Sequence, residues 1–180
     1  MKKILLIFIL TTGILSCFCD DVDPFWNVND FQLEFLNDEN AWSTSDTVTL
    51  DTINFVIDFD FTYVAENYFQ NPFISTAAAA SCPNPGMDGM KDPITNITLT
   101  CNEDYNTFAA GESLNSIVKH NGIEGFQSFV DQVATFPAVD FISFTVMEKP
   151  IDLDSLKFTV QLDFQSGTNI SKETGNIFWQ

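Results

Sequence analysis

The chain has 180 residues, of which 45% are hydrophobic and 19 are Phe, a composition typical of a folded domain rather than a disordered acidic segment. It carries 25 acidic residues against seven basic ones, and all seven are Lys. Bidentate binding of phosphate usually depends on the planar Arg guanidinium, so the lack of Arg argues against kinases, nucleotide-binding enzymes and phosphate transporters. The net charge of −18 also disfavours nucleic acid as a partner.

Residues 1–16 predict a bacterial secretory signal peptide. Lys2 and Lys3 form a short positive region, and an unbroken apolar run follows from Ile4 to Leu10. This run is shorter than the roughly 20 residues that a membrane-spanning helix requires. Residues 14–17 read Ile-Leu-Ser-Cys and resemble the bacterial lipobox, in which the first position is more commonly Leu.

The lipobox resemblance implies that Cys17 becomes the acylated first residue of the mature protein, anchored in a membrane by fatty acids such as palmitate. An ordinary signal peptide followed by a free Cys is the alternative. Asp20, Asp21 and Asp23 predict an acidic tether over residues 17–24. An acidic cluster here resembles the surface-export tag of Bacteroidota lipoproteins, and a plain solvated linker is the alternative. Loss of residues 1–16 removes two Lys and leaves about 20 net negative charges.

The remaining residues, 25–180, predict one mainly β domain. Apolar and polar residues alternate with a period of two, as in half-buried strands, over residues 31–35, 53–63, 97–101, 142–146 and 158–164. The alternation over residues 53–63 is the longest and predicts the clearest strand. Residues 177–179 predict a last strand. Residues 64–93 show no regular period and predict a long excursion between two core strands.

Helical patterns are few. Residues 122–134 place apolar side chains on one helical face and predict one amphipathic helix of about three turns. A shorter helix is predicted over residues 113–118, with Ser113 as its N-cap. Many antiparallel strands with one or two short helices in a crossover predict an antiparallel β-sandwich, broadly immunoglobulin-like.

Cys82 and Cys101 predict a disulfide bond. They are the cysteines of the predicted domain, and an exported compartment permits disulfides. The bridge would close a loop of about 20 residues, which corresponds to roughly 3 kcal/mol in the chain-entropy description. Two separate buried thiols are the alternative.

Several motifs together resemble a family of uncharacterised Bacteroidota lipoproteins. They are the lipobox at 14–17, the acidic tether, Cys-Pro-Asn-Pro-Gly at 82–86, the stretches 92–100, 104–106 and 110–115, and the strands at 158–160 and 178–179. The resemblance covers nearly the whole chain. It implies an exported, lipid-anchored protein with a single β-rich domain, and it implies no particular chemistry.

Catalytic and metal-binding patterns are weak. His120 is the only histidine, so a His-based zinc site is excluded, and its sequence context predicts a solvated turn rather than a catalytic base. Asp58 and Asp60 alternate with core aromatics, so we expect them on a solvent face instead of in a calcium or glycosidase site. No metal, cofactor or enzymatic activity is therefore predicted.

Two patterns point to glycans. Thr47, Thr52 and Ser155 each follow Asp and precede an apolar residue, which resembles the O-glycosylation motif of secreted Bacteroidota proteins. Trp42, in a predicted loop, is a candidate for stacking on a sugar ring, whereas Trp179 is predicted to be a core residue. The sequence thus predicts a non-enzymatic, lipid-anchored protein of the outer membrane or cell surface that binds a protein or glycan partner. The alternative is a glycan-binding lipoprotein of a polysaccharide-uptake system.

Overall fold

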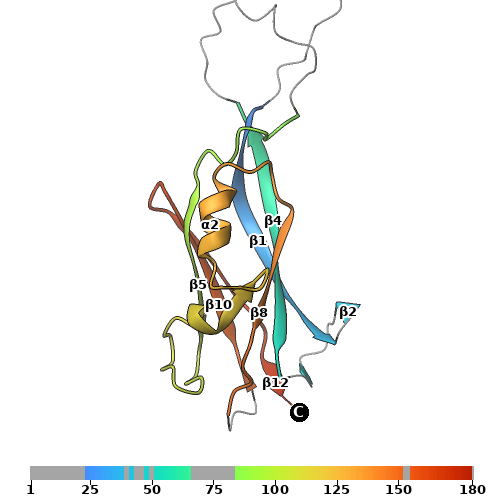
Figure 1. Ribbon diagram of the computed structural model, residues 1–180, viewed down its shortest axis with the longest axis vertical. Coiled ribbons are helices and arrows are strands. Elements are labelled where there is room, and N and C mark those ends of the chain that lie inside the picture. Colours follow the sequence, from blue (N-terminus) through green and yellow to red (C-terminus); the bar gives the residue numbers. More distant parts are fainter. Residues whose placement is uncertain are drawn as a thin grey trace, which may run out of the picture.

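The computed structural model describes residues 23–38, 41–42, 47–48, 51–65, 84–151 and 155–179. These residues form a mainly antiparallel β-sandwich with one short α-helix, which confirms the predicted architecture (Figure 1). The larger sheet has six strands, in the order β2 (Ala41–Trp42), β1 (Phe25–Asp38), β4 (Ile53–Val64), β8 (Phe141–Val146), β6 (Val118–His120) and β7 (Ile123–Glu124).

Two smaller sheets complete the sandwich. The second sheet, packed on the first, has the order β11 (Asn169–Glu173), β10 (Phe158–Phe164) and β5 (Ile94–Cys101). The third sheet has the order β3 (Thr47–Val48), β12 (Ile177–Trp179) and β9 (Ser155–Leu156) and lies at the C-terminal end of the molecule (Figure 1). The β12–β3 pair is parallel, and the other strand pairs of the described chain are antiparallel.

The core follows the predicted period of two. Every second residue of β10, from Phe158 to Phe164, is buried, and the residues between them are half-buried. Phe55 of β4 meets the edge of Phe158 at a ring-centroid distance of 5.0 Å and stacks on Phe144 of β8 at 5.1 Å. Burying one such ring stabilises the fold by about 1.5–3 kcal/mol. These rings therefore hold the six-stranded sheet and the second sheet together.

The helix α2 (Gln127–Val133) is shorter than the predicted helix over residues 122–134. Ile123 belongs to β7 and is 54% exposed, and Gly125 has a φ of +70°, which a right-handed helix cannot include. Phe129 of α2 stacks on Phe59 of β4 at 6.4 Å, and the helix also packs against β5. The helix thereby covers one side of the sandwich between the six-stranded sheet and the second sheet (Figure 1). Among the described residues, no helix is long and apolar enough to cross a membrane.

The predicted helix over residues 113–118 is only the 3-10 turn η1 (Asn115–Ile117), and Ser113 is not its N-cap. The turn does not continue into a longer helix, and its Asn115 side chain pairs with the backbone of the edge strand β5. The Asn115 side chain accepts a hydrogen bond from the Leu99 backbone N–H at 3.0 Å and donates to the Ile97 carbonyl at 2.7 Å. These bonds satisfy backbone groups that an edge strand would otherwise expose.

The predicted excursion over residues 64–93 is partly ordered by the start of β1. Residues 66–83 lie outside the described residues. On its return the chain runs beside β1, where Gly86 N–H donates to the Asp23 carbonyl at 3.0 Å and Asp88 N–H to the Pro24 carbonyl at 2.9 Å. A parallel bridge between Trp26 and Met90 continues the pairing.

Candidate functional site

A cavity of about 280 Å³ opens between the start of β1 and the hairpin that joins β10 to β11. Its walls are Asn27, Val28, Asn29, Asp92, Phe164, Thr168 and Ile170, and we call it the β1 notch. Its volume is slightly below the roughly 300–1,000 Å³ found for small-molecule sites.

Two irregularities in strand pairing shape the β1 notch. The register of β1 against β4 shifts between Val28 and Asp30, so Asn29 is an extra residue on β1. The register of β10 against β5 shifts between Asp163 and Phe164. Bulges bend a strand and re-aim its side chains, and they occur often beside functional sites. Asn29 is exposed and enters the wall of the notch as a consequence.

Asp92 organises the polar side of the notch. Its carboxylate accepts hydrogen bonds from the backbone N–H of Ser166 at 2.9 Å and from the Ser166 hydroxyl at 2.6 Å. Its own backbone N–H donates to the Asn27 side-chain oxygen at 3.0 Å. The Ser166 and Thr168 hydroxyls lie 2.9 Å apart. One carboxylate, two side-chain amides and the Thr168 hydroxyl thus line a small open space with the apolar Phe164 in its wall, a combination that can bind a small hydroxyl-rich ligand.

An ion pair fixes the hairpin against β1 next to the notch. The Lys172 ammonium of β11 lies 2.8 Å from the Asp30 carboxylate of β1. The hydrogen bond from Lys172 and that from the Phe31 backbone N–H hold the pKa of Asp30 below its ordinary value. Asp60 is the cross-strand neighbour of Asp30, so Lys172 also offsets the repulsion between two facing carboxylates.

Two residues of the predicted covalent sites, Cys17 and Cys82, lie outside the described residues. Cys101 ends β5 with a free, buried thiol that donates to the Glu103 carbonyl at 2.9 Å. Burial raises the pKa of this thiol. No disulfide is seen among the described residues, and the bridge to Cys82 stays a prediction because its second partner is not among them.

The structure brings two of the three predicted O-glycosylation candidates together. Thr47 of β3 and Ser155 of β9 are both cross-strand partners of Phe178 in β12, so they share one face of the third sheet. Adjacent strands are about 4.8 Å apart, which separates the two residues by about 10 Å. Thr52 lies in a bend just before β4, and all three residues are half-buried.

Trp42 forms β2, paired with Leu36 of β1, so the predicted loop at this position is wrong. A two-residue strand carries too little sequence pattern to be recognised. The Trp42 side chain is not among the described ones, and its stacking role stays a prediction. Trp26 is fully buried, with its indole N–H donating to the Phe136 carbonyl at 3.2 Å, and Trp179 is 9% exposed, as predicted for a core residue.

The prediction of a solvated His120 is wrong, because this side chain is buried. It ends β6, and the turn that follows has a positive φ at both Asn121 and Gly122. The ring faces inward, with Nδ1 2.8 Å from the Ser143 carbonyl and Nε2 3.0 Å from the Asn121 side-chain nitrogen. Both ring nitrogens are therefore engaged in structural hydrogen bonds. The sequence correctly predicted a turn here, but it did not predict that the His120 ring points inward.

The other acidic candidates behave as surface residues. Asp58 and Asp60 are exposed, as predicted. Within the described ranges, no group of three or more His, Cys, Asp or Glu side chains is placed to hold a metal ion.

The β1 notch had no signal in the sequence, because its polar residues come from separate segments. Comparison with protein-family models, curated proteins and solved structures found no match for the chain.

Proposed function

We propose that the chain is an exported, non-enzymatic binding module that is held at an outer membrane by a lipid on Cys17. The lipobox-like residues 14–17 carry this proposal. The described fold begins at Asp23, six residues after Cys17, and an extended segment of that length spans about 20 Å. The anchor therefore keeps the domain close to the lipid surface.

Metabolic labelling with a fatty-acid analogue in a bacterial host tests the anchor. Wild-type protein should carry the label, and Cys17→Ala should lose it together with signal cleavage. Cys19→Ala is the matched control, because it removes a cysteine two residues away and should keep the label. Label that survives in Cys17→Ala, or that is missing from wild type, refutes the anchor.

The second candidate function is binding of a small glycan in the β1 notch. It is favoured by the grouping of Asn27, Asn29, Asp92 and Thr168 beside the ring of Phe164. Amide and carboxylate groups bind sugar hydroxyls through several directed hydrogen bonds, while an apolar wall contacts the ring carbons.

Calorimetric titration of the mature protein with a panel of mono- and disaccharides tests this second function. Asn29→Ala should weaken binding about tenfold, as loss of a well-placed hydrogen bond implies. Asn96→Ala is the matched control, because Asn96 is also exposed but bonds to Asp163 on β10 and is not part of the notch wall. Equal affinities for the two variants refute the notch as the site.

A further inference from the structure

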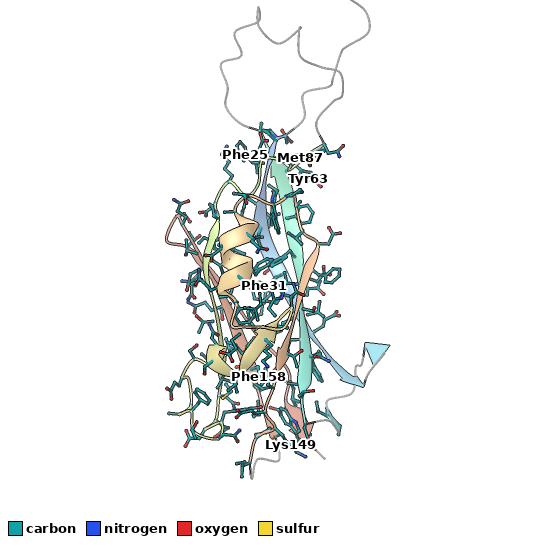
Figure 2. The ribbon with its side chains drawn as sticks, viewed as in Figure 1. Phe25, Phe31, Tyr63, Met87, Lys149 and Phe158 are labelled. Atoms are coloured by element: carbon teal, nitrogen blue, oxygen red, sulfur yellow. The ribbon has the colours of Figure 1, made fainter. Side chains whose placement is uncertain are left out.

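Three of the large apolar side chains that are exposed in the described chain lie at the end of the molecule where that chain begins. Figure 2 places Phe25, Tyr63 and Met87 together at this end and Lys149 at the opposite end. Tyr63 is 44% exposed, Met87 47% and Phe136 45%. Phe136 belongs to the same end, because its carbonyl accepts the indole N–H of Trp26. We call these three exposed residues, together with the half-buried Phe25, the apolar tip.

The apolar tip is held in place by close backbone packing. The hydrogen bonds of Gly86 to Asp23 and of Trp26 N–H to the Gly89 carbonyl, at 3.1 Å, tie the returning segment to β1. A Cβ atom at Gly86 would lie 2.8 Å from the Tyr63 ring, and one at Gly89 would lie 2.2 Å from the Ala134 carbonyl oxygen. The exposed rings and the thioether therefore project from a packed base rather than from a frayed end.

The length of chain before Asp23 indicates what covers the apolar tip. Asp23 is only six residues after Cys17, so the tip is the part of the domain nearest to a lipid on that cysteine. Tyr side chains favour the headgroup level of a membrane, where one end of the ring is apolar and the other is wet. The acidic domain is repelled by anionic lipids, so a zwitterionic phospholipid surface is the fitting occupant.

We propose that the apolar tip rests in the interface of a zwitterionic phospholipid layer and holds the sandwich upright on the membrane. This inference rests on the proposed function, because the lipid on Cys17 brings the tip to the surface. Met87, Tyr63 and Phe136 enter the interface from three different segments. The third sheet, with Thr47 and Ser155, then faces away from the membrane at the other end (Figure 1).

Depth-sensitive fluorescence tests this orientation. The mature lipoprotein is reconstituted into phosphatidylcholine vesicles with or without bromine on the acyl chains, which quenches nearby indoles. Met87→Trp places a reporter in the tip. Ile151→Trp is the matched control, since Ile151 is 69% exposed and lies two residues from Lys149 at the other end. The emission of the unmodified protein is subtracted to remove the three native Trp residues.

The added emission of Met87→Trp should be lost in brominated vesicles, and that of Ile151→Trp should be unchanged. Phe136→Trp gives a second reporter from another loop and should also lose its emission. If the protein floats with the vesicles but the tip reporters behave like the Ile151→Trp control, the orientation is overturned. The cover of the tip would then be the chain between Ala65 and Asn84 or a protein partner. Protein that does not float with the vesicles overturns the lipid anchor, and this orientation with it.

Discussion

Replacing Phe158 by Ala should be the most damaging single change in the core, because this ring joins all three sheets. Phe158 of β10 is fully buried. Its ring centroid lies 5.0 Å from that of Phe55 in the large sheet, 6.2 Å from that of Trp179 in the third sheet and 5.8 Å from that of Tyr105. Truncation removes these three contacts at once and leaves a cavity among large rings that cannot close in easily.

The expected loss follows from burial and from the ring contacts. Phe→Ala substitutions in a core cost about 3–5 kcal/mol, and aromatic pairs contribute about 0.5–1.5 kcal/mol beyond their buried area. With three such pairs, we expect the free energy of unfolding to fall by about 5 kcal/mol. For a domain of this size each kcal/mol corresponds to about 2–4 °C, so the Tm should drop by about 10–20 °C.

Thermal unfolding followed by near-ultraviolet circular dichroism measures this drop through the packed aromatic rings. Phe141→Ala is the control, because Phe141 is 58% exposed on β8 and loses little on truncation. Its free energy of unfolding should change by about 0.5 kcal/mol or less. A Phe158→Ala variant that melts within a few degrees of Phe141→Ala would refute the placement of Phe158 at the junction of the sheets.

Three further predictions concern an edge strand, a thiol and an ion pair. Asn115→Ala leaves two backbone groups of β5 unpaired and should lower the free energy of unfolding in urea by about 1–3 kcal/mol; an unchanged midpoint contradicts the bonds. Because the Cys101 thiol is free and buried in the structure, it should resist alkylation in the native protein and react after denaturation without reductant, which would reject the predicted bridge to Cys82; reaction only after reduction would instead support that bridge. Lys172→Met should raise the pKa of Asp30 in a carboxyl-detected NMR titration. Since the folded pKa of Asp30 is lowered, the stabilising contribution of the Asp30–Lys172 pair is present above the ordinary value of 3.8 and is lost as the pH falls through the folded pKa. The chemical-denaturation curves of wild type and Lys172→Met should therefore converge at that pH.

The large strands were predictable because one face of each is buried. In β10 and in the first half of β4 the core requires an apolar residue at every second position, and that requirement appears directly in the sequence. The predicted strand over residues 53–63 agrees with β4 for this reason. Strands of two residues, such as β2 and β9, are set by pairing with neighbours distant in sequence, and no local pattern identifies them.

The helix over residues 122–134 was overestimated because spacing alone does not distinguish a helix from a turn followed by a helix. Ile123 has helical spacing, three and seven positions, from Phe126 and Val130, yet it lies exposed in β7. In the structure Gly125 has a positive φ, which ends any helix that would begin earlier. A glycine inside an amphipathic pattern is compatible with a helix at some cost, so the sequence alone does not decide between the two structures.

The β1 notch could not be predicted, because it depends on two shifts of register. Asn29 is an extra residue on β1, and nothing in its neighbourhood distinguishes it from an ordinary outward-facing strand residue. Asp92 contacts Asn27, 65 positions earlier, and Ser166, 74 positions later. Such contacts exist only once the sheets have packed, whereas the lipobox-like residues at 14–17 are contiguous and are recognised without a fold.

The orientation of the domain and the glycan function of the β1 notch constrain each other. Asn27 and Asn29 lie two and four residues beyond Phe25 on β1, which places the wall of the notch about 7–13 Å from the apolar tip at the rise of a strand. A membrane that contacts the tip leaves room for a mono- or disaccharide but restricts the approach of a long polysaccharide. We therefore expect vesicle-anchored protein to bind small sugars as tightly as detergent-solubilised protein does, and a long polysaccharide of the same sugar more weakly. Equal loss for both sizes would show that the vesicle blocks the notch itself, and no loss for the polysaccharide would place the notch farther from the lipid than the tip orientation allows.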